Sequence, residues 1–262
     1  TEGAAPVLAR RIKADVEERL PVELGQLAGI ARDYRESAAK LPGGRARRAF
    51  WSRFLDADGP AALAEGGEDA ARGALERLIA EYEDGEPQRE TGRVILVGAG
   101  PGDPELLTLK ARRILHEADV VLYDRLVDPR ILELARREAE LIEVGKTPGG
   151  PAWKQDDINA AMIGHAQSGA VVVRLKSGDP MVFGRADEEL DTLDAAGVAW
   201  EVVPGITSAS AAAASSGRSL TRRGRNQAIT FLTAHEAQGY AEHDWRALAR
   251  PGKAIAIYMG LR

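Results

Sequence analysis

Short apolar runs alternate with helical segments from residue 93 to residue 205, and this alternation limits the possible folds more than any other feature of the chain. The runs lie at 94–97, 120–123, 141–144, 171–175 and 198–203. Runs of this kind, rich in Val, Ile and Leu, are typical of strands buried on both faces of a sheet. Strands that alternate with helices predict an α/β domain with a parallel sheet. Functional residues of such a sheet are expected just beyond the carboxyl ends of its strands.

The first predicted strand runs into a glycine-rich turn, G-A-G-P-G-D at 98–103. Glycine lacks a Cβ, so a ligand can come close to the backbone of this turn. Asp103 and Pro104 fit the N-cap and the first position of a helix, which is expected over 106–117. The pattern approaches the dinucleotide fingerprint G-x-G-x-x-G, with Asp124 in the place of the ribose-binding acid. Asp103 replaces the third glycine, however, and a tight strand-to-helix turn explains the glycines equally well.

Composition excludes several kinds of functional site. The 262 residues contain no cysteine, which rules out disulfides, thiolate metal ligands and a thiol nucleophile. The four histidines have no metal-ligand spacing, so no metal is expected. A formal net charge of -5 argues against general nucleic-acid binding. No apolar run approaches the roughly 20 residues of a membrane span, and no signal peptide opens the chain, so we expect a cytoplasmic protein.

Residues 1–83 are predicted to form a helical region, and the polar residues 84–92 are predicted to be a linker. Apolar residues recur in this region at helical spacing, and each apolar stripe needs a surface that covers it. Short helices bury little surface by themselves, so we expect the region to form a homodimer. The alternative is that the stripes are covered within the chain.

The rest of the chain is expected to hold two α/β subdomains. Residues 93–205 form the parallel sheet, and residues 206–262 begin a second subdomain with strands at 228–233 and 253–259. The chain starts with Thr1 rather than Met, and it stops directly after a predicted strand, which would leave a sheet edge uncovered. We therefore expect a fragment of a longer protein, with a truncated second subdomain.

Several motifs occur in the order found in tetrapyrrole methylases, and the chain resembles this family, in particular the uroporphyrinogen-III C-methyltransferases. They are V-G-A-G-P-G-D-P-E-L-L-T-L-K (97–110), V-V-L-Y-D-R-L-V (120–127), V-G-K (144–146), V-V-R-L-K-S-G-D-P-M-V-F-G-R (172–185), E-V-V-P-G-I-T-S-A-S (201–210), L-T-R-R (220–223) and Y-M-G-L (258–261). The N-terminal part resembles the helical dimerisation region of siroheme synthases. The motifs of that region are P-V-L-A-R-R-I-K (6–13), L-P-V-E-L-G-Q-L-A (20–28) and R-R-A-F-W (47–51).

The resemblance implies a methyltransferase that converts uroporphyrinogen III to precorrin-2 in siroheme and cobalamin biosynthesis. Its methyl donor is S-adenosylmethionine, bound between the two α/β subdomains and released as S-adenosylhomocysteine. This cofactor carries no phosphate, which accounts for Asp103 in the glycine turn. Asp124 matches the family's proposed proton acceptor and Lys146 its proposed proton donor. The residues that match cofactor contacts are Pro101, Ser177, Gly178, Asp179, Val182, Thr207, Ser208 and Met259.

The substrate carries several carboxylates, which arginine binds through two parallel hydrogen bonds. The candidates to hold it are Arg125, Arg185, Arg222 and Arg223, and also Lys146 and Arg225. The chain departs from the family at some of these motifs. Ser177 replaces a glycine and Ser208 an alanine, and Arg222 stands where histidine is common.

Two alternatives remain open at this point. One is an NAD-dependent oxidoreductase that uses the glycine turn and Asp124, and the other is a non-catalytic dimerising fragment. In siroheme synthases the methyltransferase is fused to a precorrin-2 dehydrogenase and a ferrochelatase. NAD would then bind only in an N-terminal domain outside this chain, and neither additional activity is assigned to residues 1–262.

Overall fold

The computed structural model describes residues 5–18, 20–42, 45–84, 92–145, 153–236 and 239–260. The chain forms two compact units, Thr1–Arg89 and Glu90–Arg262, which are described separately. Within the described residues, no helix is long and apolar enough to cross a membrane.

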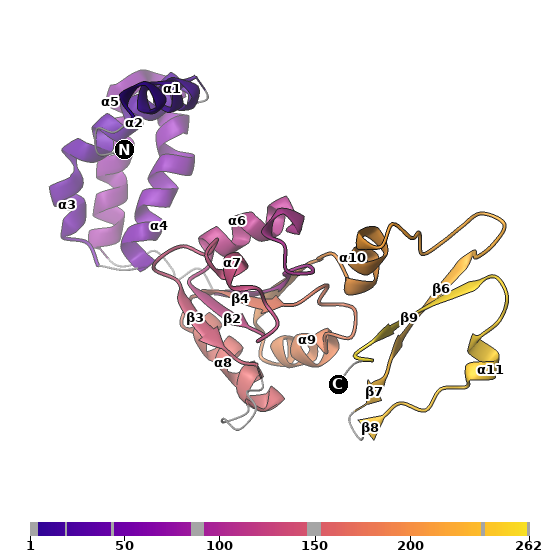
Figure 1. Ribbon diagram of the computed structural model, residues 1–262. Coiled ribbons are helices and arrows are strands. Elements are labelled where there is room, and N and C mark those ends of the chain that lie inside the picture. Colours follow the sequence, from indigo (N-terminus) through magenta and orange to yellow (C-terminus); the bar gives the residue numbers. More distant parts are fainter. Residues whose placement is uncertain are drawn as a thin grey trace. The chain divides into compact units, whose positions relative to one another are not determined.

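The first unit is helical, as predicted (Figure 1). Its elements are α1 (Pro6–Glu17), α2 (Val22–Asp33), α3 (Arg35–Ala39), α4 (Arg45–Arg53), the π-helical turn η1 (Phe54–Asp58) and α5 (Gly59–Glu83). Gly66 and Gly67 interrupt α5 with non-helical backbone angles, so residues 70–82 form the second half of α5. The core of this unit joins α2, α4, η1 and α5, and its fully buried residues include Leu27, Ile30, Phe50, Phe54, Leu75 and Leu78.

The second unit is built on the parallel sheet that the sequence predicts. Its strands are β1 (Arg93–Gly98), β2 (Val120–Tyr123), β3 (Glu140–Glu143), β4 (Val171–Lys176) and β5 (Ala199–Val203), in the order β3-β2-β4-β1-β5. All neighbouring pairs are parallel, so the carboxyl ends of the strands share one edge of the sheet.

Helices cover both faces of this sheet (Figure 1). The helices on one face are α6 (Leu109–Glu117) and α7 (Pro129–Leu132), and those on the other are α8 (Gln155–Gln167) and α9 (Ala186–Ala195). Alternate residues of β1 point to the two cores: Val94 and Leu96 join α8 and α9, whereas Ile95 and Val97 join α6 and α7. Burial on both faces is the reason for the continuous apolar runs in the sequence.

The connections place crevices on both sides of the end of β4. The chain leaves β1 and β2 toward α6 and α7 on one face, but it leaves β4 toward α9 on the other. Neighbouring strands whose connections diverge in this way open a crevice at their carboxyl ends, where α/β proteins bind ligands. By this rule, one crevice is expected between β1 and β4 and another between β2 and β4.

Two helices are shorter than the sequence predicts. Asp103 caps only a 3₁₀ turn, η2 (Pro104–Leu106), and α6 begins after Thr108, whose Oγ1 accepts a hydrogen bond from the Ala111 amide at 3.1 Å. Residues 128–138 have helical composition, but the helix that they begin ends at Leu132. Beyond it, the side chain of Arg136 pairs with Asp119, and we attribute the break to this tertiary contact.

The segment after the sheet carries α10 (Ser208–Ser215) and two strands at the predicted positions, β6 (Ala228–Thr233) and β9 (Lys253–Tyr258), which pair in parallel. Between these strands lie the short β7 (His235–Glu236), β8 (Gly239–Tyr240) and α11 (Trp245–Leu248). The Tyr258 hydroxyl hydrogen-bonds the Thr207 Oγ1 at 2.6 Å, and its ring contacts Phe183 with 5.0 Å between centroids. The end of β9 therefore lies beside the start of α10 and the loop after β4.

Candidate functional site

Glycines bring the carboxyl ends of β1, β4 and β5 into backbone contact. Gly100 and Gly178 exchange two backbone hydrogen bonds, of 3.0 and 2.8 Å. A Cβ on Gly98 would lie 2.5 Å from the Gly205 nitrogen, and one on Gly205 would lie 2.2 Å from the Gly178 oxygen. Those distances are shorter than any real contact, so only glycine permits this approach. The predicted glycine turn is therefore one side of a wider glycine-lined junction.

Asp179 fastens this junction with its side chain. Its Oδ1 accepts a hydrogen bond from the Met181 amide at 2.8 Å, and its Oδ2 accepts one from the Gly205 amide at 3.1 Å. Val182 also bonds Asp179, through its amide and the Asp179 carbonyl oxygen at 3.2 Å. Both carboxylate oxygens of Asp179 thus hold loop backbone in place.

Strained backbone is concentrated at this edge of the second unit. Within the described residues, Phe183, Arg185 and Met259 are the only non-glycine residues with positive φ, at 54°, 54° and 56°. This conformation costs on the order of 1–3 kcal/mol for each residue and is found mainly at functional sites. Phe183 and Arg185 lie in the loop after β4, and Met259 follows Tyr258, which contacts that loop.

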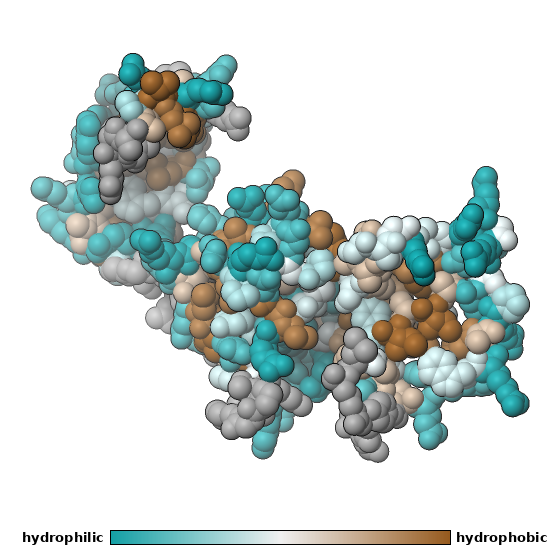
Figure 2. Space-filling model, in the orientation of Figure 1, coloured by the Kyte–Doolittle hydropathy of each residue, from teal (hydrophilic) through white to brown (hydrophobic). Residues whose placement is uncertain are grey.

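The start of α10 faces the Gly178 turn. A Cβ on Gly178 would lie 3.9 Å from both the amide nitrogen and the Oγ of Ser208, which is ordinary contact distance. Ser208 and Met259 also line an open groove of about 980 Å³ along α10 and β9. Its walls are mostly apolar, and apolar side chains gather over this part of the molecule (Figure 2). Pro101 and Asp124 do not line it.

The predicted cofactor residues therefore lie near one another on three adjacent loops and the end of β9. Pro101 is exposed in the turn after β1, beside the pairing of Gly100 with Gly178. Ser177, Gly178, Asp179 and Val182 follow β4, and Thr207 and Ser208 open α10. The hydrogen bond between Tyr258 and Thr207 brings Met259 to the same region.

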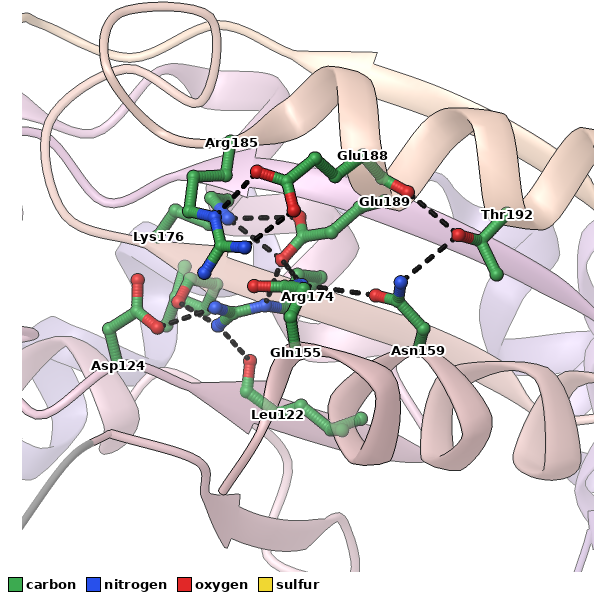
Figure 3. A network of polar contacts seen from close by, with 11 residues as sticks. Leu122, Asp124, Gln155, Asn159, Arg174, Lys176, Arg185, Glu188, Glu189 and Thr192 are labelled. Atoms are coloured by element: carbon green, nitrogen blue, oxygen red, sulfur yellow. Dashed lines mark hydrogen bonds and ion pairs between the residues drawn. The ribbon is translucent and has the colours of Figure 1, made fainter. Parts of the chain in front are cut away.

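Asp124 lies in the second crevice, directly after β2, and pairs with a residue of the neighbouring strand. Its Oδ1 accepts a hydrogen bond from Arg174 Nη2 at 2.5 Å (Figure 3). Its side chain is 32% exposed, whereas that of Arg174 is 4% exposed. The cation nearest to Asp124 in the sequence is Arg125, but the residue that pairs with Asp124 is Arg174, from the centre of the sheet.

A buried polar network extends from Arg174 across α9 and α8 (Figure 3). Glu189 on α9, which has no exposed surface, accepts a hydrogen bond from Arg174 Nε at 3.0 Å. Its two oxygens also accept hydrogen bonds from Lys176 Nζ, at 2.8 and 2.9 Å. The Gln155 amide bridges Glu189 and Asn159, and Asn159 donates a hydrogen bond to Thr192 at 3.0 Å.

Burial is the main cause that lowers the pKa of Lys176, and the positive charge of Arg174 is the second, while Glu189 raises this pKa.

The sequence contains a signal for this network that the local patterns did not reveal. In the run V-V-V-R-L-K, Arg174 and Lys176 are two residues apart, so they point to the same face of β4. That face packs on α9, which supplies Glu189. Two cations on one face of a central strand require buried anions.

The predicted substrate-binding arginines lie on the surface of the second unit. Arg125 is exposed after β2, where its backbone and Cβ touch Gly145. Arg185 pairs with Glu188 through hydrogen bonds of 2.7 and 2.5 Å. Arg222 and Arg223 are exposed in a turn closed by backbone bonds between Arg222 and Asn226. Lys146, the predicted proton donor, lies outside the described residues.

The geometry favours a ligand other than a dinucleotide at the glycine turn. In the dinucleotide fold the helix N-terminus meets the pyrophosphate directly after the glycines. Here Asp103 and η2 intervene, and α6 begins only at Leu109. The Asp103 carboxylate accepts a hydrogen bond from the Glu105 amide at 3.0 Å, and its negative charge would repel a pyrophosphate.

Among the described residues, no three His, Asp or Glu side chains are grouped to hold a metal ion.

Comparison with known families accounts for both units. Residues 93–262 match the tetrapyrrole (corrin/porphyrin) methylases, and residues 23–79 match the sirohaem synthase dimerisation region. The chain is 48% identical to a siroheme synthase of Chromobacterium violaceum over 99% of its own length and 54% of the relative. It is 44% identical to a siroheme synthase of Thioalkalivibrio sulfidiphilus over 100% of its own length and 53% of the relative. The chain thus spans about half the length of these relatives.

Solved structures show the same similarity. A uroporphyrin-III C-methyl transferase from Thermus thermophilus, complexed with S-adenyl homocysteine, is 48% identical with a TM-score of 0.55. The match covers 64% of this chain and 70% of that one. A cobalt precorrin-4 methyltransferase is 32% identical with a TM-score of 0.52, over 60% of this chain and 63% of that one.

Proposed function

Because the chain belongs to the tetrapyrrole methylase family, we propose that it methylates uroporphyrinogen III with S-adenosylmethionine and so forms precorrin-2. The family match over residues 93–262 carries this proposal. It is supported by the relatives named siroheme synthase and by the uroporphyrin-III C-methyl transferase of similar structure. The pathway we propose is siroheme biosynthesis.

We place a nucleoside cofactor that lacks phosphate at the carboxyl ends of β1 and β4. Gly100 and Gly178 have positive φ, and a Cβ on Gly100 would lie 3.5 Å from the Leu106 oxygen, which is ordinary contact distance, so no atom crowds this backbone. We assign S-adenosylmethionine to this crevice and to the start of α10. When bound, it supplies a methyl group on a sulfonium centre. The residues that would hold it are Pro101, Ser177, Gly178, Asp179, Val182, Thr207, Ser208 and Met259.

The chain's own task is to orient the pyrrole carbon and to remove the proton that the methylated ring must lose. We assign proton removal to Asp124. Its Oδ1 is held by Arg174, and no described residue donates a hydrogen bond to Oδ2, which leaves this oxygen as the acceptor. The role of Lys146 as proton donor rests on the family motif alone. Exposed arginines would bind the substrate carboxylates, and they are Arg125, Arg185, Arg222 and Arg223.

Cofactor binding tests this function directly. In isothermal titration calorimetry we expect S-adenosylhomocysteine to bind and NAD to give no heat. Gly178→Ala should weaken S-adenosylhomocysteine binding at least about tenfold, because the methyl group would point into the crevice beside Ser208. Gly197→Ala is the matched control, since Gly197 has a similar φ of 64° and open space around it. Binding of NAD, with none of S-adenosylhomocysteine, would contradict the proposal and favour the oxidoreductase.

We further propose that the first unit forms a homodimer. Its match to a dimerisation region supports this, as do the apolar side chains that α1 leaves exposed, among them Leu8, Ile12 and Val16 at 53%, 52% and 48%. These three residues recur every fourth position and share one face of α1. Figure 2 shows apolar surface on the helical unit.

Breaking the apolar face of α1 should separate the dimer. We expect Ile12→Glu to halve the mass measured by light scattering, because a buried unpaired carboxylate opposes association. Arg10→Glu places the same side chain on the opposite face of α1 and should leave the mass unchanged. Equal masses for both variants and the wild type would show that any interface lies elsewhere.

We propose the following organisation for the chain. Residues 1–83 are the dimerisation region, 93–205 the first methylase subdomain and 206–262 the beginning of the second. Residues 84–92 are the linker, of which 85–91 lie outside the described residues. For the longer protein suggested by the relatives, we propose the additional dehydrogenase and ferrochelatase activities, with NAD bound outside these 262 residues.

A further inference from the structure

Among the described residues, the charged part of the network behind Asp124 has one partly exposed member, Asp124 itself. Arg174, Lys176 and Glu189 are 3%, 5% and 0% exposed, and Asp124 is the carboxylate through which this cluster of charges reaches the crevice. Apolar side chains of the same size often stabilise a fold as well as a buried ion pair does. Fold stability alone therefore does not explain this cluster, and we look for its function at Asp124.

Asp124 is fixed by backbone and side chain together. Its amide donates to the Leu175 oxygen at 3.2 Å, and its carbonyl oxygen accepts the Val127 amide at 3.0 Å. Arg174 then holds Oδ1. Because Oδ1 is bound and the main chain is fixed, Oδ2 is held in one orientation at the crevice.

Arg174 is in turn immobilised by the scaffold. Its Nε is bound to Glu189 on α9, and its Nη1 lies 3.5 and 3.4 Å from the carbonyl oxygens of Leu122 and Leu175. Lys176 occupies both oxygens of Glu189, so the anion is shared by two cations. A guanidinium with contacts on all three nitrogens cannot rotate away from Asp124, whereas a lysine could.

We infer that Arg174, anchored by Glu189, is a positioning residue that sets the direction of the Asp124 carboxylate for proton removal. The inference rests on the proposed function, in which Asp124 accepts the proton. Arg174 is 3% exposed and is not proposed to touch the substrate. Its effect passes through Asp124, so it must vanish when Asp124 can no longer accept a proton.

Arg174→Lys tests the inference, because it keeps the positive charge and removes the planar guanidinium group with its several N–H donors. We expect kcat for methylation to fall roughly 10- to 100-fold, as for a misplaced catalytic group. KM for both substrates and the affinity for S-adenosylhomocysteine should change less than about threefold. Arg136→Lys is the matched control. This variant removes a largely buried guanidinium from Asp119, which directly precedes β2, the strand that Asp124 follows. It should leave kcat unchanged.

A double-mutant cycle with Asp124→Asn separates positioning from a general structural role. In the Asp124→Asn background we expect Arg174→Lys to lower kcat by less than about twofold, because both changes act on one step. An equal loss in both backgrounds would overturn the inference. Should Arg174→Lys fail to fold, Glu189→Asp serves in the same cycle, since it withdraws the anchor of Arg174 by one methylene.

A crystal structure of Arg174→Lys gives a second readout that does not depend on activity. We expect the Asp124 carboxylate to occupy more than one rotamer, and an unchanged single rotamer would overturn the inference. A wild-type protein that fails to methylate uroporphyrinogen III would refute the proposed function instead. An active wild type with an additive cycle would refute only the positioning role.

Discussion

Asp124→Asn is expected to lower the rate of uroporphyrinogen III methylation by roughly 10²–10⁴-fold, the usual effect of removing a general base. Asparagine keeps the size of the side chain and can still accept the hydrogen bond from Arg174, but it cannot take up a proton. Affinity for S-adenosylhomocysteine should stay the same, because the proposed cofactor residues lie on other loops. The measurements are kcat in the longest natural chain that contains this sequence and calorimetry on the same protein.

Asp194→Asn is a control for the general effect of such a change. Asp194 accepts a hydrogen bond from Trp200 Nε1 at 2.7 Å near the end of α9, and an amide can replace it. Near-normal turnover in Asp124→Asn would reduce Asp124 to a strand-end residue. Loss of S-adenosylhomocysteine binding in a folded Asp124→Asn protein would place Asp124 in the cofactor site and revive the oxidoreductase reading.

The strands and the edge at which Asp124 lies could be predicted from the sequence, because strands buried on both faces have a local signature. The run at 94–97 forms β1 and the run at 120–123 forms β2, and both belong to the parallel sheet. What could not be predicted depends on contacts between distant residues. Arg174 is fifty positions from its partner Asp124, and nothing in the local sequence favours it over the adjacent Arg125.

The glycines show the same division. Their clustering at 98–102 predicts a turn, and the turn is there. The reason why Gly98 cannot carry a side chain is Gly205, which closes on it from the end of β5. Similarly, 128–138 has helical composition throughout, yet the helix stops at Leu132 and Arg136 pairs with Asp119. Tertiary contacts override local propensity in such segments.

Glu189→Gln should destabilise the second unit more than any surface change. Glu189 is fully buried, and its carboxylate is the shared partner of Arg174 and Lys176. Glutamine is nearly the same size but removes the charge, which leaves two buried cations with only the carboxylate of Asp124 nearby. Breaking a buried ion pair in this way typically costs about 3–5 kcal/mol. Guanidinium unfolding followed by circular dichroism measures the difference.

Glu188→Gln is the matched control for Glu189→Gln, because it makes the same change one residue earlier on α9. Glu188 is 47% exposed and pairs with Arg185 at the surface, where an ion pair contributes at most about 1 kcal/mol.

The loss in free energy of unfolding caused by Glu189→Gln, relative to the wild type, should also shrink as pH rises. Burial lowers the pKa of folded Lys176 below its ordinary 10.5, and losing Glu189 lowers it further. Between that pKa and 10.5 the unfolded chain binds more protons than the folded one, so stability increases with pH. Equal stability of the two variants, with the same pH dependence, would show that Glu189 does not neutralise the cations of β4.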